Sequence, residues 1–115
     1  MSSPEDRFKG QVKQHLTMKY GGVWITKPRT RFGVAGVSDV LWCFPPSGRF
    51  VALEFKDPNG SYKATKLQED FLGEVDKAGG IAHVIDSWEA VRDLEVDLRA
   101  SAESLSLYLD DALPT

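Results

Sequence analysis

The sequence predicts a domain that combines helices and strands (α/β in the broad sense, α+β in detail). A mixed sheet is flanked by helices, and the elements follow the order α-β-β-β-α-β-α. Three observations support this prediction: apolar residues recur at helical spacing, short segments are rich in β-branched and aromatic residues, and Gly or Pro clusters separate these segments. The chain has 115 residues, of which 42% are hydrophobic, which is enough for one domain with its own core. We expect this domain to occupy residues 1–99, and an amphipathic helix or tail to follow over residues 100–115.

The first helix is predicted to begin at Pro4, because Ser3 is a favourable N-cap and proline suits the first helical position. Three apolar residues then recur at helical spacing, namely Phe8, Val12 and Leu16. Two glycines at 21–22 end the helix, a short strand follows at 23–26, and a loop rich in Gly and Arg occupies residues 28–38.

Two hairpin strands are predicted next, at residues 40–44 and 50–56, on either side of the turn sequence at 45–48. The first strand is a continuous apolar run, which is typical of a strand covered on both faces, so we expect Cys43 to be a buried, inert thiol. The second strand alternates: one face carries Val51, Leu53 and Phe55, and the other carries Ala52, Glu54 and Lys56.

The second half of the chain supplies one more strand between two helices. Thr65 and Gln68 form a capping-box pattern at the start of one helix, residues 81–85 form the strand, and Ser87 is a favourable N-cap for the next helix. A final amphipathic piece carries one helical stripe, made of Leu105, Tyr108, Leu109, Ala112 and Leu113. We expect this stripe either to fold back on its own sheet or to dock on a second copy of the chain.

Composition excludes several classes of protein. The single cysteine rules out an internal disulfide and a zinc site of several cysteines. No apolar run reaches the roughly 18 residues of a membrane span, and residues 1–9 lack a secretory hydrophobic region, so we expect a cytoplasmic protein without a membrane partner. The net charge of −3 combines +5 over residues 1–31, +1 over residues 32–66 and −9 over residues 67–115. The basic first part keeps nucleic-acid binding open, although charges scattered over solvated faces would give the same counts.

Asp39, Glu54 and Lys56 are the residues most indicative of chemistry. Asp39 opens the first hairpin strand directly after Gly36-Val37-Ser38, and the other two share one face near the end of the partner strand. Pairing across the hairpin brings two carboxylates and an ammonium group together at the edge of the sheet. Such a group suits Mg²⁺ and phosphodiester hydrolysis. The alternative is an exposed Glu–Lys strand pair beside an Asp that caps a turn.

Two motifs resemble known nucleases. Residues 36–39 followed by Glu54-Phe55-Lys56 resemble the PD-(D/E)xK nuclease superfamily, except that Ser38 stands where many relatives have proline. The continuation resembles the VRR-NUC family, the virus-type replication-repair nucleases, over about residues 5–95. The segments that carry this second resemblance are Leu67-Gln68, Phe71-Leu72 and Ala78-Gly79-Gly80 before a hydrophobic strand.

The resemblance implies a restriction-endonuclease-like core and assigns roles to four residues. Asp39 and Glu54 would be ligands of Mg²⁺ or Mn²⁺, and the backbone carbonyl of Phe55 would be a further ligand. Lys56 would be the catalytic lysine. Carboxylate and carbonyl oxygens suit both metals, so the sequence does not choose between them.

The resemblance also implies a catalytic, metal-binding glutamate on the first helix, where two acids compete. At about 100° per residue, Glu5 falls on the apolar stripe and Asp6 does not, so we assign Glu5 to the site and Asp6 to capping. Complementing the helix dipole is the other interpretation of Glu5. Gln68 is either part of the capping box or a catalytic-site residue. We expect His15 to pack or snorkel at the margin of the stripe rather than to act as a general base.

The function implied is a metal-dependent, structure-selective DNA endonuclease of DNA repair or recombination in a bacterial or phage-infected cell. Stand-alone members of the resembled family imply a homodimer that resolves Holliday junctions, with no organic cofactor. Phosphate contacts are expected from Lys27, Arg29 and Arg31 beside the loop that leads to Asp39. Two alternatives stay open: a nickase of flaps or single strands in a phage replication complex, and a catalytically silent DNA-binding subunit of the same fold.

Overall fold

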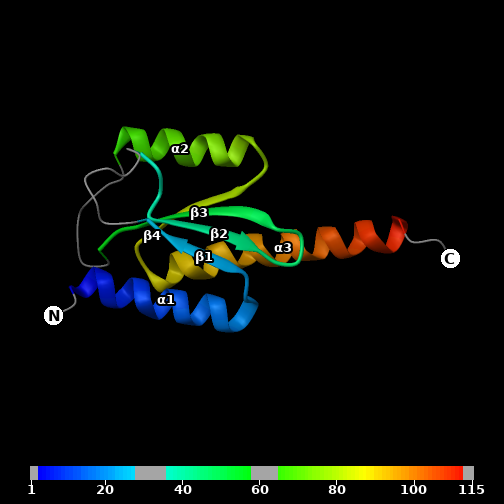
Figure 1. The fold of residues 1–115 in the computed structure, drawn as a ribbon, viewed down its shortest axis with the longest axis horizontal. Helices are drawn as coiled ribbons and strands as arrows, with labels where there is room; N and C mark the ends of the chain where they lie inside the picture. The colour runs from blue at the N-terminus through cyan, green and yellow to red at the C-terminus, as the bar shows by residue number, and fades with distance from the viewer. Residues whose placement is uncertain (1–2, 28–35, 58–64, 113–115) are drawn as a thin grey trace.

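The computed structural model describes residues 3–27, 36–57 and 65–112, with side chains as far as residue 101. The elements are α1 (Pro4–Tyr20), β1 (Val23–Thr26), β2 (Val40–Phe44), β3 (Arg49–Phe55), α2 (Lys66–Lys77), β4 (Ile81–Ile85) and α3 (Trp88–Ala112), as Figure 1 shows. The predicted order is therefore confirmed. Among the described residues, no helix combines the length and the hydropathy that crossing a membrane requires.

The helix α3 is longer than the sequence pattern suggested. The separate amphipathic piece expected after residue 100 continues α3, which runs unbroken to Ala112 and projects beyond the rest of the molecule in Figure 1. The segment contains no glycine or proline, so nothing in the local sequence interrupts the helix. The division of the chain at residue 99 stays a prediction.

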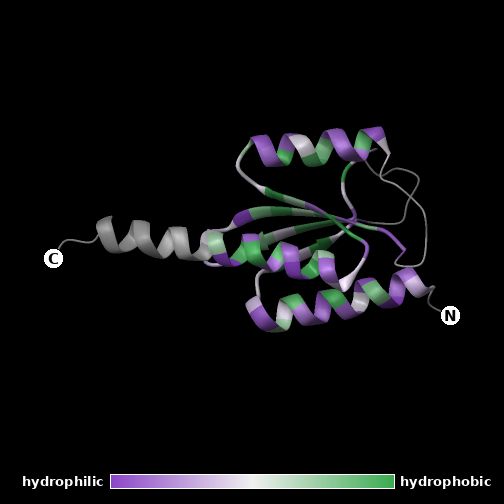
Figure 2. Cartoon of the chain, turned by 180° about the vertical axis from the view of Figure 1, so that it is seen from behind, coloured by the Kyte–Doolittle hydropathy of each residue, from purple (hydrophilic) through white to green (hydrophobic). Residues whose placement is uncertain are grey.

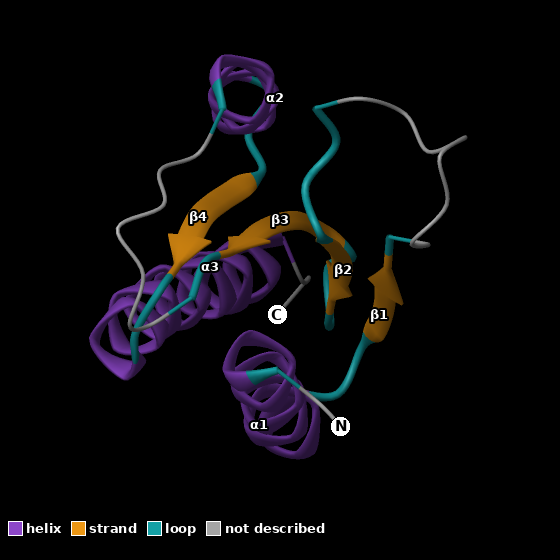
Figure 3. Ribbon diagram, turned by 90° about the vertical axis from the view of Figure 1, so that its left-hand side faces the viewer, coloured by secondary structure: helices purple, strands orange, loops and turns teal. Residues whose placement is uncertain are grey.

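One mixed sheet with the strand order β1-β2-β3-β4 forms the centre of the fold. The first three strands are antiparallel neighbours, and β4 lies parallel to β3. The helix α2 covers one face of the sheet, whereas α1 and α3 cover the other, as the end-on view in Figure 3 shows. The mixed sheet flanked by helices that the sequence predicts is therefore confirmed.

The main core lies between the sheet and the helices α1 and α3. Its helical members are Phe8, Val12 and Leu16 from α1, and Val91, Leu94 and Leu98 from α3. Hydrophobic and hydrophilic residues alternate along the helices in Figure 2, as expected of helices with one buried face. From the sheet, Val51, Leu53 and Phe55 enter this core, so the predicted alternation of β3 is confirmed.

The prediction that the strand at residues 40–44 is covered on both faces is wrong. Burial alternates along β2, and Cys43 is exposed rather than a buried thiol. The helix α2 packs mainly on β3 and β4, and Leu41 of β2 packs against its apolar residues. Phe50, the partner of Cys43 in the register, is also exposed, at 45% of its surface.

Local capping sets the ends of the helices as predicted. Ser3 accepts a hydrogen bond from the Asp6 N–H, Thr65 and Gln68 complete their capping box, and Ser87 accepts one from the Ala90 N–H. At the end of α1, Gly22 has a φ of +91°, and an added Cβ would lie 2.6 Å from Nε1 of Trp42. Only glycine therefore fits this turn into β1.

A buried carboxylate on α3 fixes the position of α1. Glu95 Oε1 accepts hydrogen bonds from Lys19 Nζ and from the Tyr20 hydroxyl, each at 2.7 Å, and Oε2 lies 3.2 Å from Nε2 of His15. His15 lies at the margin of the apolar stripe: its side chain is 40% exposed, contacts Glu95 and packs edge-on against the Trp88 ring. Burial alone would raise the pKa of Glu95, but these hydrogen bonds and the charge of Lys19 outweigh burial and lower the pKa to about 2.

We predict that Glu95→Gln destabilises the protein at neutral pH and not in acid. A carboxyl group whose pKa is lowered in the fold stabilises it above the ordinary value of 4.5, and that contribution disappears as the pH falls toward about 2. The difference from wild type should be about 2 kcal/mol at pH 6 and close to zero near pH 2, after discounting for the exposed Lys19. Urea unfolding over this pH range measures it.

Asp93→Asn is the matched control, because Asp93 is an exposed acid on the same helix. Its difference from wild type should be small at every pH. A Glu95→Gln difference that stays constant from pH 6 to pH 2 would show that the charge of Glu95 does not stabilise the fold.

Candidate functional site

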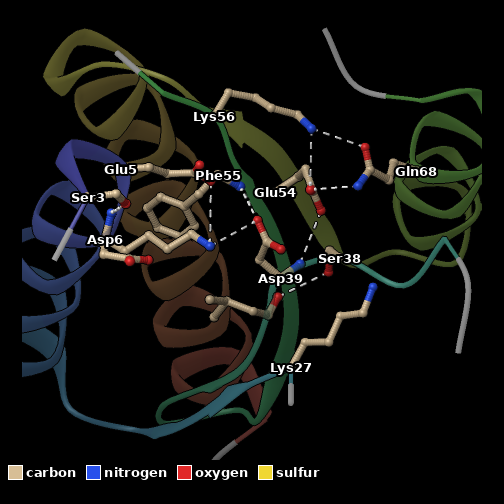
Figure 4. A network of polar contacts seen from close by, with 12 residues as sticks. Ser3, Glu5, Asp6, Lys27, Ser38, Asp39, Glu54, Phe55, Lys56 and Gln68 are labelled. Atoms are coloured by element: carbon tan, nitrogen blue, oxygen red, sulfur yellow. Dashed lines mark hydrogen bonds and ion pairs between the residues drawn. The ribbon is translucent and has the colours of Figure 1, made fainter. Parts of the chain in front are cut away.

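The hairpin register places Asp39 beside Glu54. Val40 pairs with Leu53, so the next residues outward along the two antiparallel strands are Asp39 and Glu54. The Asp39 N–H donates to Glu54 Oε2 at 3.1 Å, and the Phe55 N–H donates to Asp39 Oδ2 at 2.9 Å (Figure 4). Each carboxylate thus accepts a backbone hydrogen bond from the opposite strand, and these bonds hold the two acids together.

The segment before Asp39 is fixed by backbone geometry. Gly36 has a φ of +86°, and an added Cβ would lie 3.0 Å from Cβ of Leu67, so glycine allows the chain to pass close to the first turn of α2. The buried Ser38 donates its hydroxyl to the carbonyl of Val40 at 3.1 Å. On the other side, the Lys27 N–H donates to the Asp39 carbonyl at 2.8 Å, which ties the end of β1 to the site.

Glu54 and Lys56 form a buried pair, as their shared strand face predicts. Glu54 is 2% exposed and Lys56 is 7% exposed, and Lys56 Nζ lies 3.6 Å from Glu54 Oε1. Gln68 joins the two: its Nε2 donates to Glu54 Oε1 at 2.8 Å, and its Oε1 accepts from Lys56 Nζ at 3.2 Å (Figure 4). The interpretation of Glu54 and Lys56 as an exposed strand pair is therefore wrong.

Gln68 completes the capping box and also contacts Glu54 and Lys56, while its catalytic role stays a prediction. Its Oε1 also accepts a hydrogen bond from the Thr65 N–H at 2.9 Å, which completes the capping box at the start of α2. The same oxygen therefore closes the helix end and receives the ammonium group of Lys56. As a result, the start of α2 and the end of β3 are fixed relative to each other at the site.

Burial and a like charge change the acidity of Glu54. Removal from water and the negative charge of Asp39 raise its pKa from 4.5 to about 7, although Lys56 and the hydrogen bond from the Asp39 N–H act in the opposite direction. A carboxyl group with this pKa binds protons near neutral pH. It marks a place where negative charge is incompletely compensated by the protein itself.

Glu5 reaches the site through a lysine that the sequence interpretation missed. Lys9 Nζ lies 3.6 Å from Glu5 Oε1 and 3.6 Å from Asp39 Oδ2, so one ammonium group contacts both carboxylates. The spacing of Glu5 and Lys9, four residues apart on a helix, was a signal for their pairing, but only the packing of α1 against the sheet brings Asp39 to them. The Asp6 N–H donates to the side chain of the N-cap Ser3 at 3.1 Å, at the first turn where the sequence placed Asp6.

Two of the three basic residues expected to contact DNA, Arg29 and Arg31, lie outside the described residues. The third, Lys27, is half-buried, and its Nζ donates to the Val37 carbonyl at 3.2 Å. In Figure 4 its side chain lies alongside Ser38 and Asp39. The ammonium group of Lys27 is thus next to the site and bonded to the loop that leads into Asp39.

The donor groups fit a hard cation with few protein ligands. Within the described ranges, no group of three or more His, Cys, Asp or Glu side chains is arranged to hold a metal ion, so Glu5 does not form a three-acid cluster with Asp39 and Glu54. Mg²⁺ typically uses one or two carboxylates and keeps several waters. Asp39 and Glu54 supply that number, and the raised pKa of Glu54 shows that added positive charge would be favourable there.

We predict that Asp39→Asn lowers the pKa of Glu54. The substitution removes a neighbouring negative charge but keeps an oxygen for the Phe55 N–H, so the pKa should fall from about 7 and stay above 4.5, since burial is unchanged. An NMR titration of the carboxyl carbons in metal-free buffer measures this. Asp70→Asn, at an exposed position of α2, should leave the Glu54 pKa unaltered.

The raised pKa of Glu54 should also change how the stability of the metal-free protein depends on pH. An acid whose pKa is raised in the fold favours folding at low pH, so wild type should lose stability as the pH rises from about 4.5 through about 7. Asp39→Asn should lose less. A Glu54 pKa that is the same in both proteins would contradict the contribution of Asp39.

A comparison with solved structures finds this fold in a protein described as "VRR_NUC domain protein". The two structures superpose with a TM-score of 0.61 and 20% sequence identity, over 85% of this chain and 89% of that one. No family model and no curated protein matches the sequence. The predicted fold class and the resemblance to the VRR-NUC fold are therefore confirmed, and the chain has the fold of a VRR_NUC domain.

Proposed function

We propose that this chain is a divalent-metal-dependent endonuclease that hydrolyses phosphodiester bonds in branched DNA, as a homodimer that resolves Holliday junctions. The observation that carries the proposal is the meeting of Asp39, Glu54 and Lys56 at one end of the hairpin, within the fold of a VRR_NUC domain. A buried acid that lies beside a second carboxylate and a buried lysine is costly for a fold and is typical of functional sites.

The roles proposed for the acids follow from their donor atoms. Asp39 and Glu54 bind Mg²⁺ or Mn²⁺ together with the backbone carbonyl of Phe55. Glu5 adds a negative charge at the margin of the site. A divalent cation bound there supplies a Lewis acid for the phosphate and lowers the pKa of a bound water. Because Glu54 has a pKa of about 7, protons compete with the cation for it below neutral pH.

Lys56 is proposed to act on the reacting groups. Its ammonium group is held by Gln68 at 3.2 Å and lies 3.6 Å from Glu54, so its position is defined before substrate binds. A positioned cation can orient an attacking water and stabilise the negative charge that develops on the phosphate oxygens. Gln68 is a positioning residue for both Lys56 and Glu54.

Cleavage tests this proposal directly. Wild-type protein with Mg²⁺ or Mn²⁺ should cut a four-way junction in preference to a flap or plain duplex, and chelation should abolish cutting. Lys56→Ala should lower the cleavage rate by at least about 10²-fold, the usual scale for one electrostatic or acid–base group. Affinity for the junction should change little, because one cation is a small part of the phosphate contacts.

The matched control is Lys66→Ala, which removes an 86%-exposed lysine two residues from Gln68. It should cut at the wild-type rate. If the protein instead cuts a flap or single strand preferentially, its function is that of the nickase and not that of a junction-resolving enzyme. Metal-independent binding without any cutting would instead leave a silent DNA-binding subunit.

The homodimer is a separate prediction. A junction requires two incisions on opposed strands, which two copies related by a two-fold axis can place symmetrically. Light scattering at micromolar concentration should therefore report about twice 12.8 kDa for the full chain. A chain ending at Arg99 should be monomeric if the helical stripe of residues 105–113 makes the contact, and an unchanged dimer would assign it to another surface. A full-length monomer on junction DNA would exclude the resolvase.

A further inference from the structure

The lysine that reaches the site from α1 lies where a bound cation would also be attracted. Lys9 Nζ is 3.6 Å from Asp39 Oδ2 and 3.6 Å from Glu5 Oε1, and it lies 6.0 Å from the centroid of the Phe55 ring. Asp39 is one of the two acids proposed to hold the metal, and Phe55 supplies the proposed carbonyl ligand. An ammonium group of the protein itself therefore compensates the charge of this site.

The contacts of Lys9 are ionic rather than tightly hydrogen-bonded. Distances of 3.6 Å exceed the 2.7–3.2 Å range typical of N–H···O hydrogen bonds, whereas Lys19 contacts Glu95 at 2.7 Å. The Lys9 side chain is also 24% exposed. Lys9 is thus held by opposite charge at the rim of the site, on a long side chain that can turn toward solvent without any movement of α1.

The backbone at Lys9 is fixed independently of the site. The helix α1 buries Phe8 and Val12 on either side of Lys9 and is bound through its far end to Glu95 on α3. The ammonium group can therefore leave Asp39 by side-chain rotation alone. A phosphate of bound DNA is negatively charged, as Asp39 is, so it can replace Asp39 as the partner of the Lys9 ammonium group.

We propose that Lys9 is a built-in counter-ion of the metal site, which weakens cation binding to the free protein and couples it to DNA binding. This inference rests on the proposed function. A divalent cation on Asp39 repels the ammonium group of Lys9, so the cation binds weakly while Lys9 stays. When DNA binds, Lys9 moves to a phosphate and this repulsion is removed. Because the coupling between two binding sites is reciprocal, the bound cation strengthens DNA binding by the same factor.

The affinity of the full-length, metal-free protein for Mn²⁺, measured by calorimetry at low ionic strength, tests the proposal. Lys9→Met removes the charge and keeps the length of the side chain, and it should bind Mn²⁺ at least ~5-fold more tightly than wild type, the lower end of typical coupling between sites. Lys9→Arg keeps the charge and should bind Mn²⁺ as weakly as wild type. Lys13→Met removes an exposed lysine one turn further along α1, and its affinity should equal that of wild type.

Coupling to DNA is measured with a four-way junction in proteins that also carry Lys56→Ala, which slows cutting. Mn²⁺ should tighten junction binding when Lys9 is present, and by a smaller factor with Lys9→Met. A Lys9→Met protein that binds Mn²⁺ no more tightly than wild type, while Lys9→Arg is folded and equal to both, would overturn the inference and leave Lys9 as a helix partner of Glu5. Failure of the proposed function looks different: Asp39→Asn would then bind Mn²⁺ as well as wild type.

Discussion

The reciprocal hydrogen bonds between the backbone and the carboxylates of Asp39 and Glu54 are the constraint on which the site depends. Each acid accepts an N–H from the opposite strand, so two like charges are held side by side at the end of the β2–β3 hairpin. The register of the hairpin determines this meeting, because a slip of one residue would turn Glu54 toward the main core. The cost of the arrangement is visible in the raised pKa of Glu54.

The site is assembled from both layers of helices around this pair. On one face of the sheet, α2 contributes Gln68, whose amide group binds Glu54 and Lys56 and caps its own helix. On the other face, α1 contributes Lys9, which contacts Asp39. The helix α1 is held at its far end by Glu95, whose carboxylate receives hydrogen bonds from Lys19 and Tyr20. The apolar core and the Glu95 contacts therefore position groups that lie at the opposite end of α1.

The two buried acids affect stability in opposite directions: the charge of Glu54 at the site destabilises the fold, whereas the charge of Glu95 on α3 stabilises it. Glu95 is buried with strong donors, so its charge favours folding above acid pH. Glu54 is buried beside another carboxylate, so its charge disfavours folding near neutral pH in the absence of a cation. A buried acid that the protein leaves incompletely compensated suits the cation site that we propose.

The sequence by itself determined the elements, their order and the central chemical group. Capping residues such as Ser3 and Thr65, and apolar periodicity, act over a few residues, so the chain encodes them locally. The hairpin likewise joins Asp39 to Glu54 through short-range pairing. Only the tertiary structure decided that Gln68 contacts Glu54, that Lys9 reaches Asp39, and that Cys43 is exposed. These outcomes depend on where α1 and α2 pack against the sheet, and that position results from the whole core rather than from any neighbouring residues in the chain.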